Sequence, residues 1–203
     1  MATAASGKAT GKASGAVPRS TWAAYAACAW AFLFAVPSFY WAAGGTSALA
    51  STVSPDLVRL AQERVPWFVA VLWITGAMKV FAGLVALALV RRWGGSFPGL
   101  LLLTLAWGAG TLLAWHGALF VGAGSLMLGG FMPNCPSPGL SEVARWYTFL
   151  WGPWFVLGGM LFIAAGWSYL RGLPDRRTAW TFSMLGVLGG LGFSIAMLLL
   201  GVG

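Results

Sequence analysis

The sequence predicts an all-α fold, a polytopic transmembrane helical bundle of five spans. Two observations support this prediction. The chain of 203 residues is 59% hydrophobic and only 8% charged. Its charges gather in short segments between long apolar stretches, and no charged residue falls between Arg92 and Glu142 or after Arg177. Because so few polar side chains cannot cover a water-exposed surface, a bilayer must be the solvent of this chain.

Five segments are long enough to cross a bilayer, since a spanning helix needs about 20 apolar residues. In lipid each segment must be helical, because an open backbone would leave its polar groups unsatisfied. Pro66 and Pro98 suit the first turn of a helix, where the missing N–H costs nothing. We therefore expect one membrane domain, residues 21–203, with spans at about residues 22–43, 66–90, 98–121, 147–170 and 178–200.

The first 20 residues differ from the rest of the chain. Residues 1–20 consist largely of Ala, Gly, Ser, Thr and Lys, which predicts a disordered cytoplasmic tail. A cleaved signal peptide is the alternative, with Ala48-Leu49-Ala50 as the cleavage site. We favour the tail, because the apolar stretch that follows exceeds the roughly 7–15 residues of a usual signal-peptide core.

Lysine and arginine in the short loops predict the orientation, because these residues are retained on the cytoplasmic side. With the N-terminus inside, only Arg59, Arg64 and Arg145 fall on the outer side. We therefore expect a cell-membrane protein, of the bacterial inner membrane, with a cytoplasmic N-terminus and an external C-terminus. Membrane lipids are its expected partners, and nucleic acid is not, because the cations are scattered. The cytoplasmic set is Lys8, Lys12, Arg19, Arg91, Arg92, Arg171, Arg176 and Arg177.

A short motif recurs in the chain. Pro-Trp-Phe-Val occurs at Pro66–Val69 and at Pro153–Val156, and Ser-Pro-x-Leu precedes each copy, beginning at Ser54 and Ser137. We interpret this as a tandem repeat of two helical hairpins, with one extra helix after them. Chance recurrence in a Trp-rich chain is the alternative. In the first copy, residues 54–64 alternate apolar and charged side chains, which predicts a short amphipathic helix on the outer surface.

Lys79 is the most informative candidate for function, because an unpaired charge near the bilayer midplane costs at least a few kcal/mol. Its helical neighbours Gly76 and Gly83 are small, so we expect Lys79 to point into the bundle. It is interpreted either as a contact for an anionic or carbonyl-bearing ligand or as a lysine that only locks packing or extends toward the headgroups. The predicted spans hold no Asp or Glu, which argues against a proton relay or an ion pump.

Other candidate site residues lie at the outer ends of the spans. His116 is the single histidine, and a lone histidine on an apolar face is more often structural than catalytic. Tryptophan and tyrosine favour membrane interfaces, and they crowd the outer end here. We predict an outward-facing ligand site between the two hairpins. Its residues are Lys79, His116, Tyr40, Trp41, Trp67 and Trp154.

Motifs for catalysis or metal binding are weak. Cys28 and Cys135 belong at different depths, so we do not expect them to pair. One histidine and two separated cysteines do not form a metal site, and no phosphate loop or nucleophile elbow is present. We expect no cofactor and no metal, and an enzyme has little residue support. Gly186 and Gly190 form a G-x-x-x-G motif, which favours packing within the chain over dimerisation.

Three segments resemble an uncharacterised bacterial family of small multi-span membrane proteins, a domain of unknown function. They are Phe39–Gly45, residues 79–89 and Gly152–Gly159. The resemblance covers about residues 20–170, implies a bacterial inner-membrane bundle, and transfers no functional residue. The chain is also loosely similar to the tryptophan-rich sensory proteins that bind porphyrins, but their Trp-x-Pro-Pro signature is absent.

These observations favour a membrane protein that binds a small molecule or a lipid between its two hairpins. The alternative is a structural or accessory subunit that packs against another membrane protein, or against a second copy, and has no ligand of its own. Lys79 distinguishes the two, because only a ligand-binding protein needs its ammonium.

Overall fold

The computed structural model of the chain describes residues 21–91, 98–131 and 138–199, and these residues are almost entirely helical. Five helices are long and apolar enough to cross a membrane, which confirms the predicted all-α class. A 3₁₀ turn lies at Leu49–Ser51, and a π-helical turn lies at Tyr147–Trp151. The α-helices are α1 (Trp22–Ala42), α2 (Pro55–Gln62), α3 (Pro66–Ala88), α4 (Gly99–Leu128), α5 (Pro138–Trp146), α6 (Gly152–Leu170) and α7 (Arg176–Leu199).

Two long helices extend beyond the predicted spans. α4 continues through Gly122 and Gly124 to Leu128, whereas the sequence predicted an end near Val121, and it ends at the glycine pair Gly129 and Gly130. Gly130 has a φ of +74°, a conformation that glycine adopts without steric cost. The fourth span begins earlier than expected, because α5 runs through the π-helical turn directly into α6.

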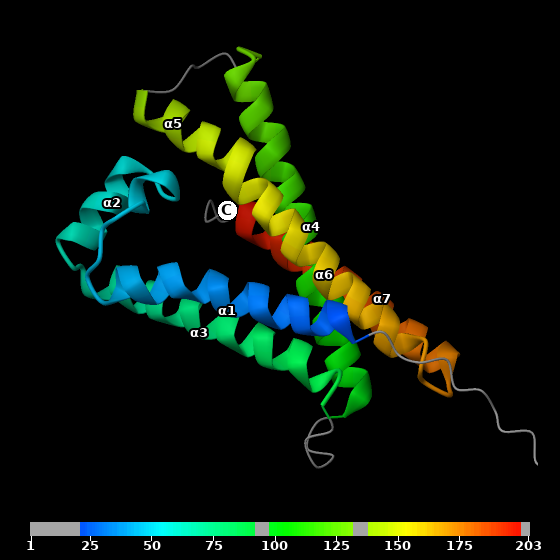
Figure 1. Cartoon of the computed structure of the whole chain (residues 1–203). Helices are drawn as coiled ribbons and strands as arrows, with labels where there is room; N and C mark the ends of the chain where they lie inside the picture. The colour runs from blue at the N-terminus through cyan, green and yellow to red at the C-terminus, as the bar shows by residue number, and fades with distance from the viewer. Residues whose placement is uncertain (1–20, 92–97, 132–137, 200–203) are drawn as a thin grey trace, which may run out of the picture.

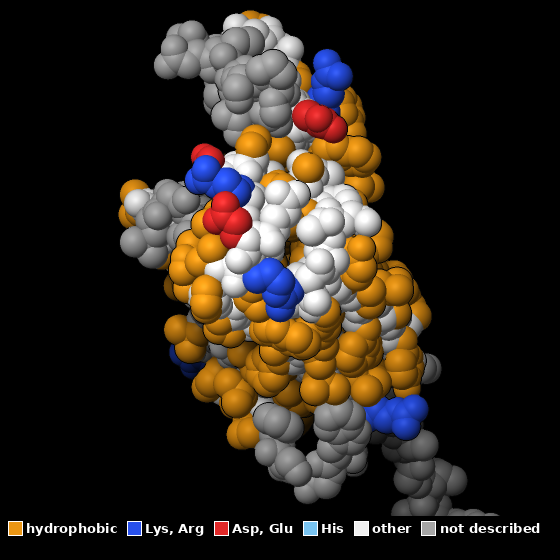
Figure 2. All heavy atoms as spheres, turned by 90° about the vertical axis from the view of Figure 1, so that its left-hand side faces the viewer, with side chains coloured by type: hydrophobic (Ala, Val, Ile, Leu, Met, Phe, Trp, Pro, Cys, Tyr) orange, Lys and Arg blue, Asp and Glu red, His pale blue; other side chains and the backbone are white. Residues whose placement is uncertain are grey.

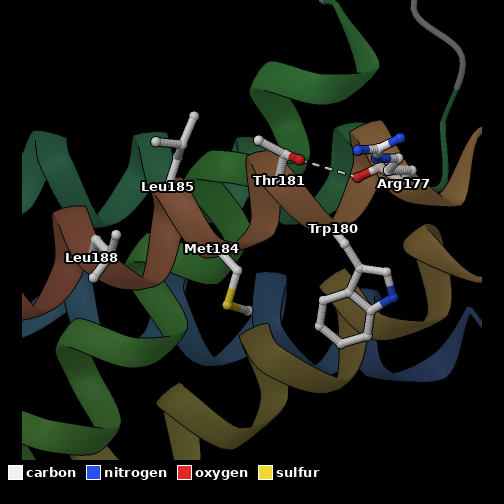
Figure 3. Close-up of a pocket in the computed structure, with 6 residues that line it drawn as sticks. All are labelled: Arg177, Trp180, Thr181, Met184, Leu185 and Leu188. Atoms are coloured by element: carbon white, nitrogen blue, oxygen red, sulfur yellow. Dashed lines mark hydrogen bonds between the residues drawn. The ribbon is translucent and has the colours of Figure 1, made fainter.

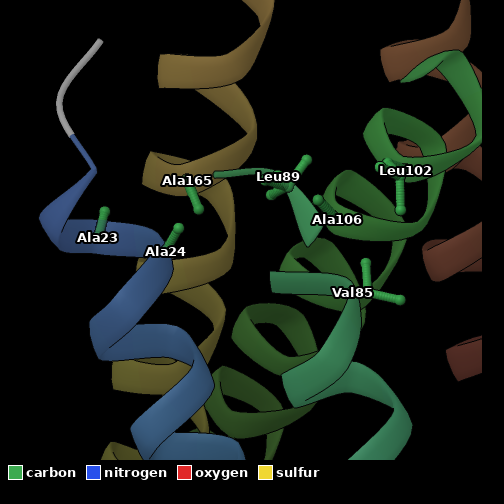
Figure 4. Close-up of a cluster of buried hydrophobic side chains, with 7 residues drawn as sticks. All are labelled: Ala23, Ala24, Val85, Leu89, Leu102, Ala106 and Ala165. Atoms are coloured by element: carbon green, nitrogen blue, oxygen red, sulfur yellow. The ribbon is translucent and has the colours of Figure 1, made fainter. Parts of the chain in front are cut away.

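The long helices form two units that diverge toward one end of the molecule (Figure 1). α1 packs along α3, α4 packs along both α6 and α7, and a smaller contact between α1 and α6 joins the units. α2 and α5 lie at the end where the units diverge. The units meet where α1 begins and α3 ends (Figure 4), and small side chains let four helices approach there. This contact consists of Ala23, Ala24, Val85, Leu89, Leu102, Ala106 and Ala165.

Glycines spaced by seven residues bring α4 and α6 into backbone contact. A Cβ atom added at Gly117 would lie 2.7 Å from the Gly152 oxygen and 2.8 Å from the Val156 nitrogen. The spacing of seven keeps the members of each series on a single face of their helix, which suits helices that cross at a small angle. The two series are Gly110, Gly117 and Gly124 on α4, and Gly152, Gly159 and Gly166 on α6. Of these, Gly124 packs on Thr148 before α6, and Gly166 packs on the Trp107 side chain rather than on backbone.

The G-x-x-x-G motif of α7 serves packing within the chain, as expected. A Cβ atom at Gly186 would lie 3.1 Å from the Gly108 nitrogen of α4, and one at Gly190 would lie 3.1 Å from the Leu112 nitrogen. The hydroxyl of Thr104 also donates a hydrogen bond of 3.1 Å to a carbonyl of α7. α7 is therefore a third member of the second unit rather than a free dimerisation surface.

The predicted amphipathic helix is present as α2, and it ends in a sharp break. Arg64 has a φ of +53°, and α3 begins two residues later at Pro66. Figure 2 shows this end of the molecule, where charged side chains of both signs gather and hydrophobic side chains cover the region below them. This pattern is typical of a membrane interface above an apolar core.

Candidate functional site

Lys79 lies near the middle of α3, on the face that packs against α1. Gly76 and Gly83 are on the same face and are buried. A Cβ atom at Gly76 would lie 2.7 Å from the ring of Phe39, so the glycine makes room for that ring beside Lys79. The prediction that Lys79 points into the bundle is therefore confirmed.

Among the described residues, the Lys79 ammonium has a hydrogen-bond partner and an aromatic partner, both on α1. Its Nζ donates a hydrogen bond of 2.9 Å to the Ser38 hydroxyl and lies 3.6 Å from the centroid of the Phe34 ring. Ser38 and Phe34 are both buried. An ammonium has three N–H donors, so these contacts leave capacity for another acceptor. The chain has four carboxylates, all outside α1 and α3: Asp56, Glu63, Glu142 and Asp175.

Phe34 connects Lys79 to the second unit through an aromatic group that we call the junction cluster: Trp30, Phe34, Trp151, Trp154 and Phe155. The Phe34 ring lies 5.1 Å from Phe155 and 6.2 Å from Trp151, measured between ring centroids. The Trp30 indole packs over Gly158, and its Nε1 donates a hydrogen bond of 3.2 Å to the Trp154 carbonyl. Lys79 thus lies at the edge of the contact between α1 and α6.

His116 lies on the other side of the junction cluster. Its Nδ1 is 3.4 Å from the Ser194 hydroxyl of α7, and its ring packs edge to face against Phe120 at 4.4 Å. The His116 ring also contacts Phe155, at 6.2 Å. Lys79 and His116 are therefore linked through Phe34 and Phe155, but they are not in contact with each other.

The four aromatic candidates divide into two groups. Trp154 belongs to the junction cluster. Tyr40 and Trp41 instead bond to Ser47 in the loop after α1, through the tyrosine hydroxyl at 3.1 Å and the indole Nε1 at 2.9 Å. Trp67 is exposed at the start of α3 and packs against Phe68. The structure thus places Tyr40, Trp41 and Trp67 at the end of the first hairpin that carries α2, apart from Lys79.

Among the described residues, two hydrogen bonds join the units near the end where they diverge. The Tyr147 hydroxyl donates to the Thr52 carbonyl at 2.6 Å, and the Trp151 Nε1 donates to the Ser51 hydroxyl at 3.3 Å. Sequence reasoning found neither bond, and it also missed Ser38 as the partner of Lys79. Ser38 gave a usable signal, since it is a polar residue inside an otherwise apolar span.

Two pockets in the described part of the chain lie away from the predicted site. One is a groove of about 520 Å³ along α7, and the other, of about 60 Å³, lies between the start of α1 and the ends of α3 and α6. Neither is lined by Lys79 or His116. Within the described ranges, no three His, Cys, Asp or Glu side chains come together as metal ligands. Cys28 is a free thiol, and Cys135 lies outside the described residues.

A comparison with protein families identifies the family of this chain. A family model described as a protein of unknown function, DUF3995, matches residues 31–162. The chain belongs to this family. The match confirms the resemblance expected from the sequence, and it includes Phe34, Lys79, His116 and Trp154, whereas α7 lies beyond it. No curated protein and no solved structure matches the chain.

Proposed function

We propose that this DUF3995 protein is an integral protein of the cell membrane that binds a small ligand, either a lipid or a soluble molecule, at Lys79. One observation carries the proposal. The ammonium lies inside the bundle with one hydroxyl and one aromatic ring as its close contacts. A charge inside a membrane costs several kcal/mol unless it is paired, so intramembrane ionisable residues usually have a functional reason.

The chemistry of Lys79 defines the class of ligand. An ammonium donates hydrogen bonds and accepts none, so its ligand must present a carboxylate, a phosphate or a carbonyl oxygen. The ligand would enter from the end where the two units diverge, which is also where Tyr40, Trp41 and Trp67 lie (Figure 1). In this proposal those three residues line the approach, and Trp154 and His116 belong to the wall behind Lys79.

The proposed orientation follows from the charged residues at the two ends. Arg91, Arg171, Arg176 and Arg177 lie at the end opposite α2 and α5, and the positive-inside rule assigns that end to the cytoplasm. Cys135, between α4 and α5, is then external. A membrane-impermeant maleimide should label intact cells that carry the wild-type protein and should not label cells that carry Cys135→Ser. Labelling that requires permeabilised cells would reverse the proposed orientation.

An accessory subunit is the second candidate, and the closed packing around Lys79 favours it. Neither described pocket reaches the ammonium, and the aromatic rings of α1 and α6 pack directly on one another. In this alternative, Lys79 fixes Phe34 in the junction cluster, and the functional surface is one that contacts another membrane protein or a second copy.

Native mass spectrometry of the detergent-purified protein tests between the two candidates. Wild type should carry a defined adduct that Lys79→Met loses. Ser38→Ala is the matched control, because it removes the hydrogen-bond partner of Lys79 but keeps the ammonium, so the adduct should remain. If wild type, Lys79→Met and Ser38→Ala all carry only exchangeable lipid, the accessory candidate is favoured.

A further inference from the structure

The groove along α7 is shallow and open, because one face of that helix alone lines it (Figure 3). Its apolar members are exposed, with Leu188 at 65% and Leu185 at 52% of their full accessible area. The opposite face of α7 packs on α4 through Gly186 and Gly190. The groove therefore faces the surrounding lipid. Its lining residues are Arg177, Trp180, Thr181, Met184, Leu185 and Leu188.

The end of the groove that carries Arg177 has an excess of positive charge. Arg171 directly follows α6, Arg176 and Arg177 begin α7, and all three are exposed. The single carboxylate between α6 and α7 is Asp175, and its Oδ1 accepts a hydrogen bond of 3.1 Å from the Thr178 backbone N–H. A planar guanidinium donates paired hydrogen bonds to phosphate oxygens, so this end of the groove suits a phosphodiester.

The length of the groove matches one leaflet of a bilayer. Leu188 lies 11 residues after Arg177, or roughly 16 Å along a helix, and one leaflet of the hydrocarbon core is about 15 Å thick. Trp180 lies one turn below Arg177, at the depth that tryptophan favours, and its ring packs edge to face against Trp167 of α6 at 5.7 Å. From the charged end inward, the groove thus offers a guanidinium that can bind phosphate, then the ring of Trp180, then an apolar wall.

We infer that α7 binds one anionic phospholipid, whose phosphate contacts Arg177 and whose acyl chain lies along Met184, Leu185 and Leu188. The neighbouring arginines favour a lipid with net negative charge over a zwitterionic one, because they add attraction at the membrane surface. The site is separate from Lys79 and lies beyond the family match, so it does not depend on the proposed function.

Native mass spectrometry of delipidated protein, titrated with phosphatidylglycerol or with phosphatidylcholine of the same acyl chains, tests this inference. Wild type should bind the first phosphatidylglycerol about tenfold more tightly than phosphatidylcholine, and Arg177→Gln should abolish that preference. Arg59→Gln removes one arginine at the other end of the molecule and should keep the preference. Lys79→Met should keep it too, which separates this site from the proposed ligand site.

Photo-crosslinking locates the lipid independently of its affinity. Phosphatidylglycerol with a photoreactive group in one acyl chain should crosslink to the segment 184–188 of wild type. A preference that persists in Arg177→Gln, a preference lost equally in Arg59→Gln, or crosslinks confined to other helices would each overturn the inference.

Discussion

The two hairpins have the same order of elements, a long helix, a short helix and a second long helix, but they are held together differently. In the first, α1 and α3 meet through side chains, and Lys79 reaches Ser38. In the second, α4 and α6 meet through backbone at glycines such as Gly117 and Gly152. Backbone contact leaves no space for a polar side chain, so only the first hairpin can hold a lysine inside its interface.

The short helices α2 and α5 also differ in how they join the long helices that follow them. α2 ends in a break at Arg64, whereas α5 continues into α6 through the π-helical turn. In that turn the Gly152 N–H bonds to the Tyr147 carbonyl, five residues earlier. The stretch between the two repeated motifs is four residues longer in the second hairpin, about one helical turn. The extra length is taken up as continuous helix. The π-helical turn suits Pro153, because its wider backbone relieves the clash between the proline ring and the carbonyl four residues earlier.

The largest expected effect concerns the glycine contact of the second hairpin. Gly117→Ala places a Cβ atom 2.8 Å from the Val156 nitrogen, against a backbone that cannot move aside. We expect a loss of about 3 kcal/mol in stability, measured by thermal unfolding in detergent. Gly122→Ala is the matched control on the same helix, since nothing lies within 4 Å of its added Cβ atom. Equal stability of the two variants would contradict the backbone contact.

The break between α2 and α3 gives the next effect. Arg64 has a positive φ, and its Nη1 donates a hydrogen bond of 3.2 Å to the Ala42 carbonyl. Arg64→Val and Arg64→Gly both lose that bond, but only valine pays the steric cost of the left-handed conformation. The Arg64→Val protein should therefore be less stable than the Arg64→Gly protein by about 1–2 kcal/mol in the same unfolding measurement. If the two variants unfold together, the positive φ is not required.

The hydrogen bonds between the units give the smallest effect. Tyr147→Phe removes the bond to the Thr52 carbonyl and should lower stability by about 1 kcal/mol. Tyr40→Phe removes an exposed bond to Ser47 within the first hairpin and should change stability little. Hydrogen exchange at residues 49–53 should rise in Tyr147→Phe alone. A rise in both variants, or in neither, would show that this bond does not join the units.

Much of the fold could be predicted from the sequence, because spans depend on composition and length. The inward direction of Lys79 could also be predicted, since Gly76 and Gly83 mark the buried face of its helix. The partners of Lys79 could not be predicted, because a helical period identifies a face but not the helix that it meets. The glycines of α4 and α6 gave a readable signal in their spacing of seven. Tyr40, Trp41 and Trp67 lie at one end of the first hairpin, but a shared position along the helices does not by itself bring side chains together.

The central claim is that Lys79 serves a ligand rather than the fold, and thermal unfolding of Lys79→Met tests it most directly. Replacing the half-buried charge of Lys79 by an apolar side chain of similar length should leave stability unchanged or raise it, provided that the charge does not hold the structure together. The account predicts a Tm for ligand-free Lys79→Met that equals or exceeds that of ligand-free wild type. A fall of several degrees would contradict it, since the ammonium would then be needed to hold Phe34 in the junction cluster.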